Sequence, residues 1–175
     1  QEMAPAAVLV CREACEVRSV DKARETWELM QQKVPLIAQP ALWWAPERIY
    51  GVPDLLLHSS WLREKYPALA AGNQAQLVDG YLDHYMVFDL KFTTKLDQRS
   101  KAKDFESYAA QVRLYSYMLG CLQSFMPTHA YLITRDRFDD PLPVDSSSSL
   151  GDSLDEDLAA IRDRFIDIKL HGAQY

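Results

Sequence analysis

The sequence predicts a mixed β-sheet flanked by helices, that is, a protein of the α/β or α+β class. The chain has 175 residues, of which 48% are hydrophobic and 25% are charged, which is typical of one globular domain. Short apolar runs alternate along the chain with longer segments of helical periodicity, and the sequence contains no internal repeat. Their order is helix, three strands, helix and strand, which favours a sheet with helices packed on its faces.

The first predicted helix covers residues 21–33. Asp21 is expected to be its N-cap, because an aspartate side chain accepts a hydrogen bond from an amide of the first turn. Pro35 ends the helix, since proline disfavours helical backbone in the residue before it. The face of this helix that is turned to the core would hold Ala23, Trp27 and Met30.

A β-hairpin is predicted around Ala45-Pro46-Glu47, which joins the apolar run ending at Trp43-Trp44 to the run 48–57. A short helix near 61–66 is expected in the loop that follows. The remaining strands are expected at 85–93 and 130–134.

The strand at 85–93 has two different faces, because successive side chains of a strand point to opposite sides. An acid and a lysine project from one face, while the reverse face is entirely apolar. Burying charges without partners is costly, so both charges need partners, and an ion pair at the edge of the sheet is one interpretation. The apolar face, expected in the core, holds Met86, Phe88, Leu90 and Phe92, and the other face holds Val87, Asp89, Lys91 and Thr93.

Asp54 suggests a second interpretation. It lies inside the apolar run 51–57, where a solvated carboxylate is not expected. Adjacent strands would bring it beside Asp89, and two close carboxylates repel each other unless a cation lies between them. Mg²⁺ or Mn²⁺ suits two carboxylates, a backbone carbonyl and waters. The simpler alternative is that Asp54 caps a turn after Pro53.

A long amphipathic helix is predicted over residues 103–123. Gln111 and Tyr115 are four residues apart, so they share a face of this helix close to its apolar stripe. Beside an acidic site they would supply hydrogen-bonding groups. The stripe consists of Phe105, Tyr108, Val112, Tyr115, Leu119 and Leu122.

Three of these segments resemble the ordered motifs of the PD-(D/E)xK nuclease superfamily, and the glutamine and tyrosine resemble its RecB-like branch. The segments are Gly51-Val52-Pro53-Asp54, Asp89-Leu90-Lys91 and Gln111-Val112-Arg113-Leu114-Tyr115, and the resemblance covers roughly residues 21–135. It implies a restriction-endonuclease-like αβββαβ core. It also implies metal-dependent hydrolysis of DNA phosphodiesters in DNA repair, recombination or processing.

The resemblance implies metal ligands for Mg²⁺ or Mn²⁺. Asp54 and Asp89 would bind the ion, and the carbonyl of Leu90 would complete the inner shell. Members of the superfamily often add an acid from the preceding helix. Glu28 is the preferred candidate here, and Glu25 is the alternative.

The other motif residues would act on the substrate. Lys91 would position the attacking water or stabilise charge that develops on the phosphate, as a compact ammonium group can. Gln111 and Tyr115 would support the site and contact DNA. Phosphodiester cleavage calls for such a set, because a metal ion lowers the pKa of water and offsets oxyanion charge.

DNA, single- or double-stranded, is the expected partner, and the resemblance leaves open that the domain is part of a larger helicase–nuclease chain or complex. Basic side chains gather between positions 91 and 113, where they would follow a phosphate backbone. A solvated loop of mixed charge is the alternative. The expected nucleic-acid-binding residues are Lys95, Arg99, Lys101 and Arg113.

The cysteines do not predict a cofactor. Some RecB-like nucleases bind an iron–sulfur cluster through four cysteines, one before the core and three after it. This chain has only three, Cys11, Cys15 and Cys121, and none follows the core. We therefore expect no iron–sulfur cluster.

The C-terminal part differs in charge from the rest. Residues 139–175 carry nine acidic and three basic side chains, so the net charge of −6 belongs to this part. We expect a nuclease-like core at 1–138, an acidic, serine-rich linker at 139–151 and an amphipathic helix at 152–175 that packs on the core.

Two other interpretations stay open at this point. In the first, the chain is an inactive nuclease-fold module that binds nucleic acid or protein. In the second, it is an unrelated α/β domain in which the motif is fortuitous. The opening residues lack a basic, apolar leader, and no run reaches the roughly 18 apolar residues of a membrane span. We expect an intracellular protein without contact to a membrane.

Overall fold

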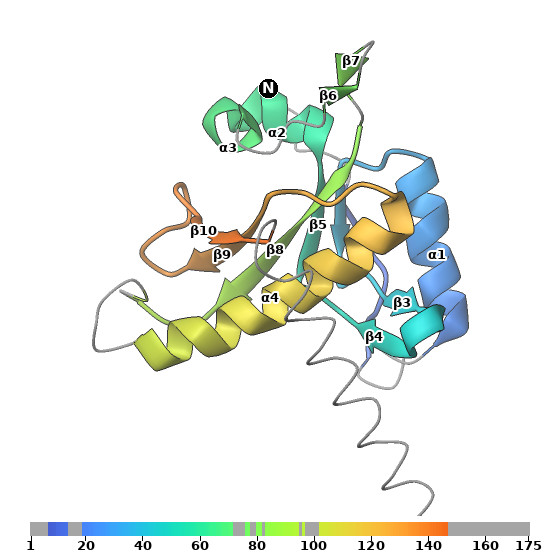
Figure 1. The fold of residues 1–175 in the computed structure, drawn as a ribbon, viewed down its shortest axis with the longest axis horizontal. Coiled ribbons are helices and arrows are strands. Elements are labelled where there is room, and N and C mark those ends of the chain that lie inside the picture. Colours follow the sequence, from blue (N-terminus) through green and yellow to red (C-terminus); the bar gives the residue numbers. More distant parts are fainter. Residues whose placement is uncertain are drawn as a thin grey trace, which may run out of the picture.

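The computed structural model describes residues 7–13, 19–71, 76–77, 80–81, 83–94, 96 and 102–146. Its centre is a six-stranded mixed sheet with helices on both faces, which confirms the expected fold class (Figure 1). The strand order is β1-β2-β5-β8-β9-β10. These strands are β1 (Ala7–Leu9), β2 (Leu36–Ala38), β5 (Leu55–His58), β8 (Tyr85–Lys91), β9 (His129–Thr134) and β10 (Leu142–Asp145).

The directions of the strands alternate in the middle of the sheet. β5 runs antiparallel to both β2 and β8, while β8 and β9 are parallel and are joined through a helix. β1 is parallel to β2, and β10 is antiparallel to β9. The elements α1, β2, β5, β8, α4 and β9 follow one another in the predicted order, and β1 and β10 extend the sheet on both sides.

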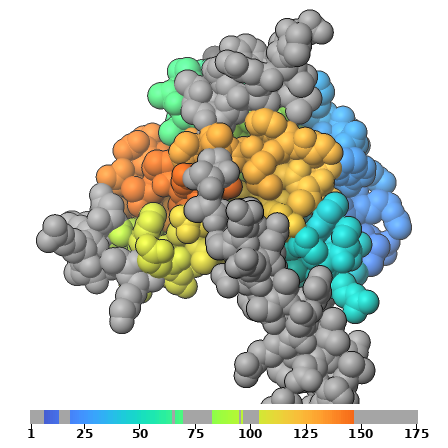
Figure 2. Space-filling view, in the orientation of Figure 1, coloured from blue at the N-terminus to red at the C-terminus, as the bar shows by residue number. Residues whose placement is uncertain are grey.

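Each face of the sheet has its own hydrophobic core. The helices α1 (Val20–Gln31) and α4 (Ala102–Gln123) contribute to the larger cluster, with Ile37, Leu56 and Val87 from the sheet. The short helices α2 (Ser59–Lys65) and α3 (Pro67–Ala71) cover the other face. In Figure 2, the C-terminal half of α4 and the β9–β10 segment occupy the middle of the visible face.

The start of α1 differs from the prediction. Ser19, rather than Asp21, is the N-cap, because its hydroxyl accepts a hydrogen bond from the amide of Lys22. The buried positions of α1 are Thr26 and Met30, and Trp27 is 41% exposed. The predicted inward position of Trp27 is therefore wrong. Thr26 faces inward because its hydroxyl accepts a hydrogen bond from the amide of Ala41 and donates one to a carbonyl of its own helix.

The predicted hairpin is confirmed only for residues 42–51, which form a separate two-stranded sheet, because the end of the predicted run 48–57 belongs to β5 of the central sheet. The hairpin consists of β3 (Leu42–Trp44), the 3₁₀ helix η2 (Ala45–Glu47) and β4 (Ile49–Gly51). A second small pair, β6 (Gln76–Leu77) and β7 (Gly80–Tyr81), lies between α3 and β8 in the chain.

The long helix is confirmed, since α4 ends at Gln123 as predicted and starts one residue early. All members of its predicted apolar stripe contribute to the larger core cluster. For β8 the prediction is right only in part. Met86 and Phe88 are buried, but Leu90 is 41% exposed and Phe92 is 95% exposed. The core beneath α2 and α3 includes Phe88 and no later residue of β8, so the end of the strand projects beyond it.

The sheet also continues past residue 138. β10 lies inside the segment that the sequence predicts as a linker, and it pairs with β9 over four residues. The predicted C-terminal helix at 152–175 lies outside the described residues. In the part of the chain that is described, no helix combines the length and the apolar character needed to cross a membrane.

Candidate active site

The acidic side chains of the motifs meet at one end of the central sheet. Leu55 of β5 pairs with Phe88 of β8, so the antiparallel register, continued by one residue, places Asp54 opposite Asp89. Alternation along the strands turns both carboxylates to the face that α4 covers, because Leu56 and Val87 lie in the core on that face. Two carboxylates from neighbouring strands therefore share one side of the sheet.

Asp54 is held by a hydrogen bond on each oxygen. Its Oδ1 accepts from the Nε2 of Gln39 at 2.8 Å, and its Oδ2 accepts from the backbone amide of Leu90 at 2.7 Å. Bonds from two separate strand ends fix the plane of this half-buried carboxylate. Asp54 therefore connects the ends of β2, β5 and β8, rather than only capping a turn.

Asp89 is almost fully buried, with 3% of its surface exposed. Its carboxylate forms an ion pair with the Nζ of Lys91, two residues further along the strand. Burial raises the pKa of the Asp89 carboxyl, Lys91 lowers it, and the carboxylate of Asp54 raises it again. Two acids and one amine give this group a formal charge of −1, and the carboxylate of Asp89 is its most buried part.

The amine of Lys91 also contacts two side chains of α4. Besides its pair with Asp89, Nζ donates to the Oε1 of Gln111 at 2.8 Å and lies 4.8 Å from the centre of the Tyr108 ring. A protonated amine over an aromatic face is attracted to it. These contacts hold the charged end of Lys91 beside the carboxylates.

Tyr115 completes the chain of contacts. The Nε2 of Gln111 donates to its hydroxyl at 3.0 Å, as the i to i+4 spacing predicts. Burial is the main cause that raises the pKa of Tyr115, and the negative charges of Asp89 and Asp54 add to it. The ring lies against Gly51 of β4, where a Cβ atom would come within 2.5 Å of Cε1. The glycine of the first motif thus leaves room for the tyrosine of the third.

The donor set at this end of the sheet fits a small hard cation. Burial and the neighbouring carboxylate of Asp54 both raise the pKa of Asp89, and a positive ion between the two acids would offset both effects. The described residues include no group of three or more His, Cys, Asp or Glu side chains that could hold a metal ion. An ion here would therefore depend on two carboxylates with backbone and water oxygens. Mg²⁺ accepts such a set, since it usually keeps several waters.

The other predicted site residues are exposed, contact other parts of the molecule or lie outside the described residues. Glu28 is on the exposed side of α1, and Glu25 pairs with Lys22 at 3.0 Å. The Nε of Arg113 donates to the backbone oxygen of Asp145, so its guanidinium joins α4 to β10. The remaining predicted DNA-binding residues, Lys95, Arg99 and Lys101, lie outside the described residues.

Three residues of the site are missing from the sequence-based prediction as site residues: Gln39, Tyr108 and Gly51. Each gave a weak signal. Gln39 is the polar end of a short apolar run, Tyr108 precedes Gln111 by one helical turn, and Gly51 opens the first motif. Their roles depend on contacts between distant segments, which spacing along one segment does not reveal.

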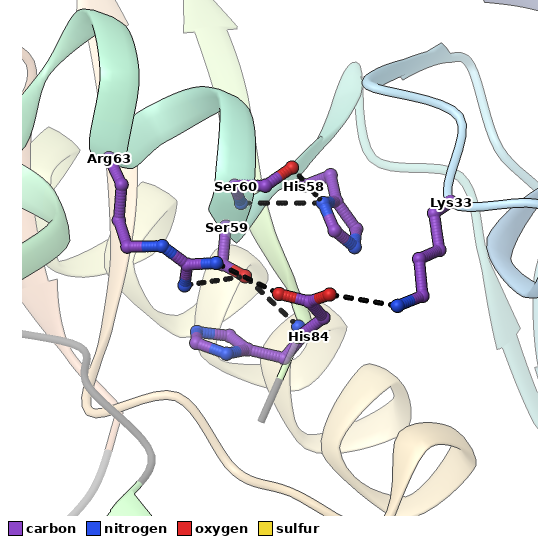
Figure 3. A network of polar contacts seen from close by, with 7 residues as sticks. Lys33, His58, Ser59, Ser60, Arg63 and His84 are labelled. Atoms are coloured by element: carbon purple, nitrogen blue, oxygen red, sulfur yellow. Dashed lines mark hydrogen bonds and ion pairs between the residues drawn. The ribbon is translucent and has the colours of Figure 1, made fainter. Parts of the chain in front are cut away.

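A second polar cluster lies at the opposite end of β5 and β8 (Figure 3). The carboxylate of Asp83 binds Lys33 and Arg63, each at 2.8 Å, and these pairs lower the pKa of Asp83 to about 2. His58 is the N-cap of α2, since its Nδ1 accepts from the amide of Ser60, whose hydroxyl is 2.6 Å away. This cluster connects the loop after α1, the helix α2 and the residues just before β8.

Comparison of the chain with protein-family models, with curated proteins and with solved structures finds no match.

Proposed function

We propose that this protein is a metal-dependent deoxyribonuclease of the RecB-like PD-(D/E)xK type, with a restriction-endonuclease-like core. The observation that supports the proposal most is the meeting of Asp54, Asp89 and Lys91, from two neighbouring strands, on one face of the sheet. The three motif segments follow one another as the resemblance requires, since Asp54 directly precedes β5, Asp89 and Lys91 are in β8, and Gln111 and Tyr115 are in α4. Mg²⁺ or Mn²⁺ is the proposed cofactor.

In this proposal, Asp54 and Asp89 hold the ion, together with the carbonyl of Leu90. A bound divalent ion supplies positive charge that lowers the pKa of a water molecule and offsets the charge of the reacting phosphate. Asp54 comes to this task already oriented, because both of its oxygens accept hydrogen bonds within the protein. Asp54 itself therefore needs little reorganisation before an ion is bound.

Lys91 supplies a fixed positive charge for the phosphate. Its amine is held from two sides, by Asp89 of its own strand and by Gln111 of α4. Because Tyr115 in turn accepts a hydrogen bond from Gln111, the helix sets the position of the amine relative to the carboxylates. Gln111 is exposed and is therefore available to contact the nucleic acid.

The alternative, a nuclease-fold module that binds nucleic acid or protein without cleavage, has one observation in its favour. The charge of Asp89 is already balanced by Lys91 within the protein. Calorimetry with Mn²⁺ separates the two. Binding that Asp54→Asn abolishes supports the metal site, whereas no binding by the wild type favours the module.

Cleavage of DNA tests the proposal directly. The purified protein is incubated with linear single- and double-stranded DNA in Mn²⁺ or Mg²⁺, beside Asp89→Ala and Lys91→Ala. We expect each substitution to lower the cleavage rate by at least about a hundredfold, as the loss of a charge-stabilising group does, and chelation of the metal to abolish cleavage.

Asp83→Ala and Lys33→Ala are matched controls. They remove the same two residue types from the cluster at the opposite end of the strands. We expect both to retain cleavage. Equal activity of the wild type, Asp89→Ala and Lys91→Ala would rule out the proposed mechanism.

A further inference from the structure

Gln39 stands in line with the two carboxylates. Ala38 of β2 pairs with Leu55 of β5, so the register, continued by one residue, places Gln39 opposite Asp54. The backbone amide of Gln39 donates to the carbonyl of Asp54 at 2.8 Å, which extends the ladder between these strands. Gln39, Asp54 and Asp89 thus form a row across three adjacent strands, on the face that α4 covers.

The backbone of Gln39 is unusual. Its φ is 49°, in the left-handed region that residues other than glycine seldom adopt, and it directly precedes Pro40. Such a conformation persists only where the surroundings enforce it. Here the backbone amide bonds Asp54, the carbonyl accepts from Cys11, and the side-chain amide bonds the Oδ1 of Asp54. The strained backbone and the side chain serve the same contact.

We propose that Gln39 is a positioning residue for Asp54. Of the two bonds that fix the carboxylate of Asp54, the one from Gln39 is the only one made by a side chain, so it is the one that a substitution can remove. A neutral amide at this place orients the carboxylate without adding negative charge. The part of the inference that concerns metal binding rests on the proposed function.

The test uses Gln39→Asn in the whole chain. Asparagine adopts left-handed backbone more readily than most residues, so the substitution spares the backbone. Its side chain is one methylene shorter, so its amide is moved away from the Oδ1 of Asp54. Gln39→Met, which keeps the length but has no donor, is the second variant. Gln31→Asn is the matched control, since Gln31 is exposed at the end of α1.

Calorimetry on the folded proteins measures the affinity for Mn²⁺. We expect the dissociation constant to rise about 10-fold to 100-fold in both Gln39 variants, as it does when a hydrogen-bond partner of a metal ligand is lost, and to stay unchanged in Gln31→Asn. Excess Mn²⁺ should then restore cleavage by the Gln39 variants. A role that is only structural would lower the melting temperature without moving this constant. Wild-type affinity in both Gln39 variants overturns the inference.

A metal-free measurement separates this inference from the proposed function. If the wild type binds no Mn²⁺, the proposed function fails, and the contact is judged by thermal unfolding of Gln39→Met, Asp54→Ala and the double variant. A double variant whose melting temperature falls by less than the sum of the two single shifts supports the positioning contact. Additive shifts overturn it.

Discussion

Gly51→Ala tests whether the site depends on the close approach of β4 and α4. The added Cβ would lie 2.5 Å from Cε1 of Tyr115 and 3.0 Å from Cε of Met118. The first distance is far below van der Waals contact. The atom that the Cβ would meet belongs to the rigid ring of Tyr115, whose hydroxyl also accepts a hydrogen bond from Gln111. The ring of Tyr115 must therefore shift, and the hydrogen bond from Gln111 is strained with it.

The size of the effect follows from two opposing contributions. Overfilling a packed core costs about 1–3 kcal/mol. Replacing glycine by alanine restricts the unfolded chain and returns about 0.4–1 kcal/mol. We expect Gly51→Ala to lower the free energy of unfolding by about 1–2 kcal/mol. In a chain of this size that corresponds to a melting temperature lower by about 2–8 °C.

Thermal unfolding followed by circular dichroism measures this change, with Gly120→Ala as the control. At Gly120 an added Cβ would also be too close to a side chain, with Met126 Cε at 2.4 Å and the backbone Cα of Met126 at 3.3 Å. The two shortest contacts are to the flexible methionine side chain, which can move away. Alanine is also better than glycine inside a helix by about 1 kcal/mol. We expect Gly120→Ala to cost less than Gly51→Ala. A Gly51→Ala protein as stable as the wild type, or equal costs at both positions, would refute the reasoning.

Two further predictions concern the polar cluster of Figure 3. Burial, as the largest cause, lowers the pKa of His58, so the folded protein holds this imidazole neutral and its stability falls as the pH drops below about 6.5. His58→Asn keeps a good N-cap. Between pH 7 and pH 5, chemical denaturation should show a smaller fall in its free energy of unfolding than in that of the wild type, and an identical fall would contradict the assignment. Because Lys33 and Arg63 lower the pKa of Asp83 to about 2, its stabilising contribution is complete above about pH 4 and is lost as the pH falls towards 2. Asp83→Ala should therefore cost about 0.2–1 kcal/mol at pH 7 in low salt and less in 1 M salt, and a cost that does not depend on salt would argue against ion pairing.

The parts of the fold that the sequence predicts well are those whose pattern is complete within one segment. The stripe of α4 repeats over about five turns, and the β3–β4 hairpin has a turn sequence between two apolar runs. The misplaced residues depend on what covers them. Leu90 and Phe92 continue the alternation of β8 but project beyond the core under α2 and α3. Neither β1 nor β10 shows a long pattern, because three or four residues at the edge of a sheet carry too little periodicity.

The residues of the candidate site also fall into those that the sequence predicts and those that it does not. Asp54, Asp89 and Lys91 stand out in the sequence because charges inside apolar strands need a reason, and the structure brings them together. Gln39 does not stand out, since a glutamine after a short strand is usually solvated. Its contact with Asp54 spans fifteen residues of sequence and depends on the pairing of β2 with β5. Only the register of the sheet makes it visible.

The register also explains why the site lies on this face. Ile37, Leu56 and Val87 are fully buried on the side of α4, one on each of the three adjacent strands. Gln39, Asp54 and Asp89 each lie two residues from one of them, and residues two apart on a strand share a face. A slip of one residue in any of these strands would turn its polar side chain away and expose its core residue. The apolar row that stabilises the sheet therefore holds the polar row in place, and the cost of misplacing the core keeps the two carboxylates together.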